Sequence, residues 1–207
     1  MAKAVLISIR PEWVEEIANR RKTIEVRKTK PNLETPFKCY IYCTNTRPFL
    51  VWGHVFRGGW SAKFTHLSGY GKAEVDRIWD VFNGHVAGEF VCDRIDTINP
   101  ETEPYGTYDV DDDFVAQTRL VYGALWDYGK GAMLYGWHIS ALKVYDTPKQ
   151  LNKFWFPPEL YCEKERCGGC PYDQVADVNG EYSFDCEWKR PLTRPPQSWC
   201  YVEESDG

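Results

Sequence analysis

A short charged segment near the amino terminus, residues 20–28 (RRKTIEVRK), most restricts how this chain can fold. Within it, Ile24 and Val26 stand two positions apart, which is the period of a β-strand with one buried face. Side chains two apart on a strand share a face, so burial of this apolar pair gathers the polar side chains on the other face. Those polar side chains are Thr23, Glu25 and Arg27. The segment therefore predicts a strand that presents a carboxylate and a guanidinium together.

Lys22 stands at the entrance of this predicted strand, where its long stem lets the ammonium group lean over the polar face. An ammonium, a carboxylate and a guanidinium would then lie side by side, as in a binding site. A different interpretation is an edge strand whose charged solvent face prevents edge-to-edge aggregation. Residue types alone do not separate these two interpretations.

The spacing of Lys22, Glu25 and Arg27 resembles the G-x-K-x-x-E-x-R signature of ASCH domains, a branch of the PUA-like fold. The context agrees, because an apolar strand at 4–9 and a helix opened by Arg10-Pro11-Glu12-Trp13 precede the motif. Two later segments also resemble this family, especially its phage-associated members. They are 86–92 (VAGEFVC) and 135–140 (YGWHIS).

One position departs from the signature, because Arg20 stands where the motif has glycine. Glycine at that position permits a positive φ or the close approach of a ligand. Arginine adds bulk and charge beside the motif instead.

The resemblance implies an α+β protein, with a PUA-like β-barrel of five or six strands and helices packed around it. It also implies binding of RNA, or of a modified nucleobase, nucleoside or nucleotide, in a basic cleft beside the motif. Lys22 and Arg27 would contact a phosphate or a base carbonyl, and Glu25 would accept from a base amino group. We expect these two cations to contribute more to binding than to stability. The candidates for a stacking wall are Trp13, Trp52 and Trp60, and Glu89 is a further ligand-binding candidate.

An enzyme is a second interpretation of the same resemblance. Some ASCH proteins are amidohydrolases that remove an acyl group from N4-acetylcytidine, and others cut RNA. In the amidohydrolases a lysine and a threonine of this strand act with a glutamate of a later strand, so Lys22, Thr23 and Glu89 are the catalytic candidates. Glu25 stands where the catalytic threonine is expected, and Thr23 lies two positions earlier. A third class is a phage-borne inhibitor that binds a host protein.

Charge is distributed unevenly along the 207 residues. The net charge of −5 argues against a general binder of polyanions. Residues 1–50 hold ten Lys and Arg against five Asp and Glu, whereas residues 74–113 hold two against twelve. A locally positive cleft on an acidic body suits a short nucleic-acid element or a nucleotide better than a long duplex.

The sequence contains no run of 18 apolar residues, so we expect no membrane span. Its first residues lack the apolar core of a signal peptide. We therefore expect a cytoplasmic protein whose eight cysteines serve as thiols or metal ligands and not as disulfides. The pattern gives no indication of the oligomeric state.

Periodicity and turn residues predict the remaining elements. The expected strands are 3–9, 38–44, 85–95 and 134–145, and the expected helices are 11–19, 114–129 and 147–154. Residues 45–73 mix aromatic and basic side chains and predict an inserted loop or hairpin, which either clamps bases or forms a local hydrophobic cluster. Residues 99–113 predict a loop. His138 is expected to hydrogen-bond to the backbone and not to act in catalysis.

The composition changes near residue 156, which predicts a domain at 1–155 and a Cys-rich extension at 156–207 packed on it. The extension has few aliphatic side chains, so it needs a metal ion or a covalent cross-link to stabilise its fold. Its C-x-x-C pair, Cys167 and Cys170, has the spacing that brings two thiolates to one zinc ion. The predicted zinc ligands are Cys162, Cys167, Cys170 and Cys186, with Cys200 as the substitute. A disulfide and unligated thiols are the alternatives.

We therefore predict one structural zinc ion per chain. Because the extension has too small a core to fold unaided, the metal should be retained through purification without chelator. Elemental analysis measures it. Less than about a tenth of an equivalent, or an extension that stays folded without metal, would contradict the prediction.

Overall fold

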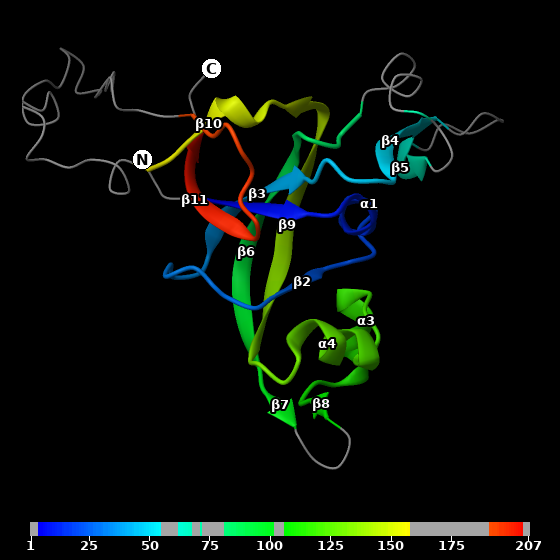
Figure 1. Cartoon of the computed structure of the whole chain (residues 1–207), viewed down its shortest axis with the longest axis vertical. Coiled ribbons are helices and arrows are strands. Elements are labelled where there is room, and N and C mark those ends of the chain that lie inside the picture. Colours follow the sequence, from blue (N-terminus) through cyan, green and yellow to red (C-terminus); the bar gives the residue numbers. More distant parts are fainter. Residues whose placement is uncertain are drawn as a thin grey trace, which may run out of the picture.

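The computed structural model describes residues 4–54, 62–67, 71, 81–101, 106–157 and 191–204. It confirms the α+β class, with seven strands in the main sheet in the order β10-β11-β1-β3-β6-β9-β2 (Figure 1). In chain order these are β1 (Ala4–Ile9), β2 (Ile24–Arg27), β3 (Phe37–Cys43), β6 (Val86–Ile98), β9 (Leu134–Lys149), β10 (Phe154–Trp155) and β11 (Trp199–Glu204). The sheet is mixed, because β1 and β3 are parallel and the other pairs are antiparallel. Five or six strands were expected, and β10 and β11, which follow the predicted strands in the sequence, raise the number to seven.

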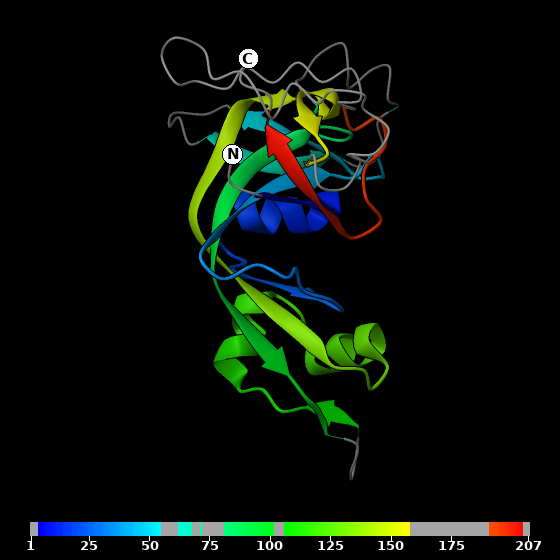
Figure 2. The same ribbon diagram turned by 90° about the vertical axis from the view of Figure 1, so that its left-hand side faces the viewer.

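The two longest strands, β6 and β9, run through the whole length of the molecule. Figure 2 shows them bending between an upper part, which holds β1, β3 and β11, and a lower part, which holds the helices α3 and α4. The register between β6 and β9 shifts at three places, including Glu89/Val91 and Cys92/Ile95. Such bulges bend a strand and increase its twist. Because β2 pairs with β9 below the bend, it lies between the two parts (Figures 1 and 2).

The main core lies between the sheet and α1 (Pro11–Ala18). Proline is favoured at the first helical position, since its missing N–H has no partner there in any case. Val14 and Ile17, three apart on one helix face, are buried against the sheet. Trp137 is fully buried below them, and its ring meets that of Phe37 edge-on with centroids 5.9 Å apart. The strand–helix–strand order predicted for residues 3–28 is confirmed.

Arg20 adopts the left-handed backbone conformation, with φ = 58°. This is the conformation that glycine, the motif residue at this position, adopts most easily. The Arg20 amide donates to the Ile17 carbonyl at 2.8 Å and so closes the turn after α1. The chain thus keeps the geometry for which the glycine is suited while carrying an arginine there.

The lower part of the molecule has its own core, formed by β2, β6, β8 (Thr107–Tyr108), β9 and the helices α3 (Asp112–Thr118) and α4 (Tyr122–Gly129). We expected one helix from 114 to 129, and this was wrong. The first helix ends at Arg119, which has φ = 60°, and the Thr118 hydroxyl accepts from the Leu120 amide just beyond it. The cap of α3 is Asp111, whose Oδ1 accepts from the Phe114 amide.

Three further predicted segments differ in extent. Residues 147–154 do not form the expected helix, because β9 pairs with β6 as far as Lys149 and only a short 3₁₀ turn, η1 (Leu151–Lys153), follows. Within 45–73, β4 (Phe49–His54) and β5 (Ala62–Leu67) form a separate antiparallel hairpin, in agreement with the hairpin alternative. The predicted loop 99–113 contains a small hairpin of β7 (Pro100–Glu101) and β8 (Thr107–Tyr108).

Part of the expected extension belongs to the main sheet. β11 pairs antiparallel with β1, so Cys200 lies opposite Leu6. Residues 158–190, which hold the four predicted zinc ligands, lie outside the described residues, and the boundary at 155/156 stays a prediction. Among the helices that the structure describes, none is long and apolar enough to cross a membrane.

Gly88 supplies a test of the bend, because it sits in β6 at a register shift. A Cβ there would lie 2.5 Å from the Lys143 carbonyl oxygen, which is backbone and cannot move aside. We expect Gly88→Ala to lower the unfolding free energy by about 2 kcal/mol, and the melting temperature by roughly 4–8 °C.

Gly123→Ala is the matched control, since a Cβ on this residue of α4 meets nothing within 4 Å. It should leave the melting temperature unchanged or raise it slightly, because alanine restricts the unfolded chain. Calorimetry of the two variants makes the comparison. Equal melting temperatures would contradict the close approach at Gly88.

Candidate nucleotide-sized binding pocket

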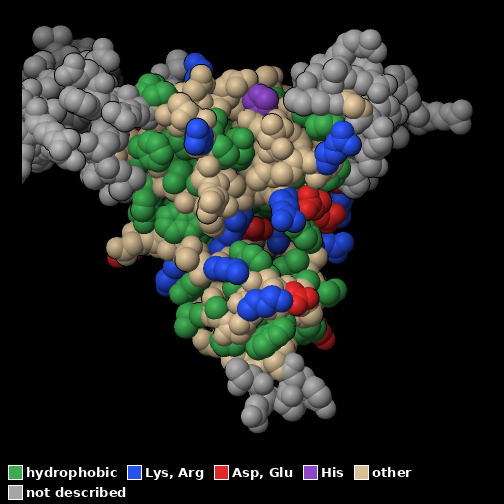
Figure 3. Space-filling view, viewed as in Figure 1, with side chains coloured by type: hydrophobic (Ala, Val, Ile, Leu, Met, Phe, Trp, Pro, Cys, Tyr) green, Lys and Arg blue, Asp and Glu red, His purple; other side chains and the backbone are tan. Residues whose placement is uncertain are grey.

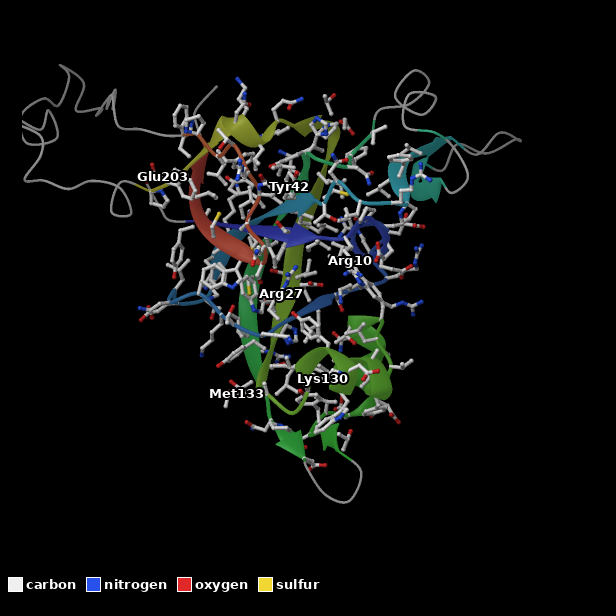
Figure 4. The ribbon with its side chains drawn as sticks, viewed as in Figure 1. Arg10, Arg27, Tyr42, Lys130, Met133 and Glu203 are labelled. Atoms are coloured by element: carbon white, nitrogen blue, oxygen red, sulfur yellow. The ribbon has the colours of Figure 1, made fainter. Side chains whose placement is uncertain are left out.

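A pocket of about 350 Å³ opens between the upper and lower parts of the molecule. Figure 3 shows recessed cationic and anionic side chains at this level, and Figure 4, in the same view, labels Arg10 and Arg27 there. The walls come from β1, α1, β2, α4 and the segment before β11. Their polar and aromatic members are Ser8, Arg10, Trp13, Lys22, Glu25, Arg27, Thr44, Tyr128 and Gln197.

Lys22 is the most deeply buried charged group of this pocket, with 2% of its surface exposed. Its Nζ donates to the Thr118 carbonyl at 2.7 Å and lies 3.3 Å from Glu25 Oε2. The same ammonium lies 5.3 Å from the centroid of the Trp13 ring, within the range of a cation–π contact. Lys22 therefore joins the motif to α1 and to the end of α3.

Glu25 stands between two cations. Its Oε2 faces Lys22, and its Oε1 lies 3.0 Å from an Arg27 terminal nitrogen. That nitrogen also donates to the Ser8 carbonyl at 2.6 Å. The sequence thus correctly placed an ammonium, a carboxylate and a guanidinium together.

The charged side chains do not face solvent as the edge-strand interpretation requires. All four residues of β2 are buried, including Glu25 at 6% and Arg27 at 8% exposed. The strand pairs with β9 and contacts α3, so its polar face closes against protein. We expected Lys22 and Arg27 to contribute more to binding than to stability, with little effect on stability if their charged heads faced solvent. The heads are buried, so that condition is not met.

Burial changes the acid–base properties of Lys22. Desolvation lowers the pKa of Lys22 below its ordinary value, because the charged form loses water, while the nearby Glu25 carboxylate opposes that shift.

Burial of Arg27 also carries an energetic cost. Its Nε is buried and has no hydrogen-bond partner among the described residues. An unsatisfied buried donor costs about 1–3 kcal/mol, so this arrangement is poorly explained by stability alone.

The three catalytic candidates do not assemble. The Thr23 hydroxyl and the Gln117 side-chain oxygen are 3.1 Å apart, and Thr23 does not line the pocket. Glu89 accepts a hydrogen bond from Tyr145 and lies 3.2 Å from the Lys38 ammonium. Tyr145 belongs to a separate cluster of buried residues, which also includes Leu6, Tyr40 and Phe154 and which we call the second core.

Glu89 is held by its neighbours in an ionised state. Burial raises its pKa, but hydrogen bonds from Tyr145 and Lys38 outweigh that effect, so the pKa lies below its ordinary value. Glu89 therefore acts as an ion-pair partner within the sheet, away from Lys22.

His138 does not bond to the backbone as expected. Its Nε2 lies 2.7 Å from Asp96 Oδ2 and 2.9 Å from a terminal nitrogen of Arg94. These groups border a second, more open pocket of about 410 Å³, which also holds Asp109, Asp111 and Asp113. The expectation failed because of the pairing between β6 and β9. Asp96 lies opposite Gly136, two residues before His138, and only this register brings Asp96 near the histidine.

The predicted zinc ligands Cys162, Cys167, Cys170 and Cys186 lie outside the described residues. Cys200, the substitute, lies in β11, and burial raises its pKa to about 12. Zinc requires a thiolate, and this shift disfavours the thiolate form of Cys200. The part of the chain that the structure describes holds no group of three or more metal-binding side chains. Zinc in the extension stays a prediction.

Several wall residues carried no signal in the sequence. Tyr128 comes from α4, Gln197 from the segment before β11, and Thr44 follows β3. The sequence partly indicated Arg10, because this residue directly precedes the proline that opens α1. The others reach the pocket only through tertiary packing.

No protein-family model and no curated protein matches the chain. Among solved structures, the chain is similar to ASCH from Zymomonas mobilis at 16% identity and a TM-score of 0.45, over 72% of this chain and 73% of that one. A tyrosine-to-phenylalanine mutant of that protein matches at 15% identity and a TM-score of 0.43, over 72% and 77%. A serine-to-alanine mutant matches at 16% and 0.37, over 70% of each chain. These are structures of the family that the motif resembles.

Glu25 allows a test of the buried charges. Glu25→Gln leaves Lys22 and Arg27 close together without their shared counter-charge, so we expect a loss of about 3 kcal/mol in the unfolding free energy. Asp127→Asn is the control, because its ion pair with Lys130 is exposed and should contribute less than about 0.5 kcal/mol. Denaturant titration measures both variants. Similar losses in the two would mean that the Glu25 ion pairs are no stronger than surface pairs.

Proposed function

We propose that this pocket binds one nucleobase, as part of RNA or as a modified nucleoside or nucleotide. The observation that carries the proposal is the buried Arg27 Nε, which has no acceptor among the described residues while Arg27 lines the pocket. Because protein atoms cover this nitrogen, a ligand oxygen would satisfy it once the guanidinium turns towards the pocket. Ligand pockets commonly place a few unpaired polar groups in this way.

The size of the pocket supports a small, flat ligand. Its volume of about 350 Å³ lies near the lower end for small-molecule sites. Trp13 and Tyr128 supply aromatic wall area, on which a base ring can stack. A nucleobase with its ribose matches both features.

The pattern of donors and acceptors supports a base edge that carries a carbonyl beside an amino group. Lys22 has three N–H donors, of which Thr118 and Glu25 occupy two. Each Glu25 oxygen faces one cation and keeps lone-pair capacity for a further donor. Lys22 and Arg27 thus suit a base carbonyl, and Glu25 suits an amino group, as cytosine and guanine present them.

The charge at the pocket supports a phosphate-bearing ligand. Two buried cations surround one carboxylate, and Arg10 is exposed on the wall. A phosphate at the mouth would meet Arg10 while the base lies inside.

Three alternatives remain as proposals of lower rank. An amidohydrolase would gain from the lowered pKa of Lys22, yet Thr23 and Glu89 lie apart from it and have other partners. A ribonuclease and a protein-binding inhibitor find no particular support in the contacts of the pocket. Binding without turnover is therefore the favoured function.

Arg27→Lys tests the proposal, because it keeps the cation beside Glu25 and removes the Nε donor. We expect the variant to bind single-stranded RNA octamers of random sequence, and the four ribonucleoside monophosphates, at least tenfold more weakly, since a charged hydrogen bond contributes about 1.5–3 kcal/mol. Fluorescence anisotropy and calorimetric titration measure the two kinds of ligand. Arg94→Lys, in an exposed arginine outside the pocket, should bind like the original protein.

The outcome against the proposal is equal binding by Arg27→Lys and Arg94→Lys, or no binding of any probe by the original protein. Incubation with N4-acetylcytidine separates binder from enzyme. If the original protein releases more cytidine than a Lys22→Ala variant, amidohydrolase activity becomes the favoured function.

A further inference from the structure

Two lysine–tyrosine pairs continue from the rim of the pocket. Lys28 Nζ lies 5.1 Å from the centroid of the Tyr128 ring, and Lys30 Nζ lies 5.4 Å from that of Tyr135. Tyr128 also lines the pocket, so the first pair begins where the pocket ends. We call Lys28, Lys30, Tyr128 and Tyr135 the lysine–tyrosine track.

The track follows directly from the pairing of β2. Arg27 is the last residue of that strand and lies opposite Tyr135 of β9, so the chain leaves the pocket beside this tyrosine. Lys28 and Lys30 are exposed, and 38% of Tyr128 is exposed. Figure 4 labels Arg27, Met133 and Lys130 in one view, and Figure 3, in the same view, shows cationic and hydrophobic side chains next to each other at that level. Met133, 45% exposed, accepts from the Tyr135 hydroxyl through its sulfur and widens the apolar surface.

The charges of the track are not neutralised by the protein. Among the described residues, no ion pair joins Lys28 or Lys30 to a carboxylate, whereas nearby Lys130 is paired with Asp127 at 2.9 Å. In a chain of net charge −5, two uncompensated lysines over tyrosine rings are a local feature and not a general excess of positive charge. Cations beside aromatic faces are the composition of surfaces that bind single-stranded nucleic acid.

We infer that the ligand is a single strand of RNA, with one base in the pocket and the adjoining nucleotides on the lysine–tyrosine track. The strand's phosphates meet Lys28 and Lys30, the base in the pocket lies against Tyr128, and the next base stacks on Tyr135. A duplex hides its base faces and does not fit this surface. The inference rests on the proposed function and extends it, since a free nucleotide would use the pocket alone.

The test compares a fluorescein-labelled random-sequence RNA octamer with ribonucleoside monophosphates. The octamer should bind the original protein at least tenfold more tightly than any monophosphate. Lys28→Ala/Lys30→Ala should remove most of that gain and leave monophosphate binding unchanged. The slope of log affinity against log salt for the octamer should become about 1.4 less steep, at about 0.7 for each lost phosphate contact.

Lys143→Ala is the matched control, because this exposed lysine also lies over a tyrosine ring, 6.0 Å from the centroid of Tyr145, next to the second core. It should keep the octamer's affinity and salt slope. Two results would contradict binding along the lysine–tyrosine track and leave the proposed function standing. One is octamer binding no tighter than monophosphate binding, and the other is identical behaviour of the double variant and Lys143→Ala. Equal affinity for duplex RNA or for a glutamate octapeptide also contradicts binding along the lysine–tyrosine track. Failure of every probe to bind the original protein removes the proposed function itself.

Discussion

The buried Glu25 carboxylate, held between Lys22 and Arg27, is the contact on which the arrangement of this molecule depends. Each cation also donates to a backbone carbonyl of a distant element, Lys22 to Thr118 at the end of α3 and Arg27 to Ser8 in β1. Residues 22–27, which include β2, thereby tie the upper part of the molecule to the lower part. Because both carbonyls point at the charges, the two parts meet around a polar pocket instead of a continuous apolar core.

Such a group of charges is costly to bury, since each ion loses its water and regains only part of that energy from its partners. The lowered pKa of Lys22 and the orphaned Nε of Arg27 are signs of this cost. Perturbed and unsatisfied groups in a pocket are more common at functional sites than in structural ion pairs. The same face continues into exposed lysines over tyrosines, where the energetic cost is small. Under the proposed function, burial makes the pocket selective and exposure makes the lysine–tyrosine track permissive.

The long curved strands explain why residues that look equivalent in the sequence have different roles. Glu89 and Glu25 are both carboxylates on strands of one sheet, yet Glu89 lies against Tyr145 on the side of the second core. The register shifts along β6 and β9 decide which face each side chain takes. A candidate catalytic set drawn from the motif and from β6 therefore comes apart in the folded protein, while the set within one strand stays together.

Local pattern by itself determined α1, β1 and β2 and the grouping of Lys22, Glu25 and Arg27, because the period of a strand and a proline at a helix start act over a few residues. It did not determine the break at Arg119 or the continuation of β9 to Lys149, where a single hydroxyl and a partner strand outweighed local preference. Only the tertiary structure decided that the charged face is buried, that Tyr128 and Gln197 complete the pocket, and that Glu89 lies elsewhere. The physical reason is distance along the chain: Lys22 meets Thr118 across 96 residues, and no periodicity records which strands and helices will close over a polar face.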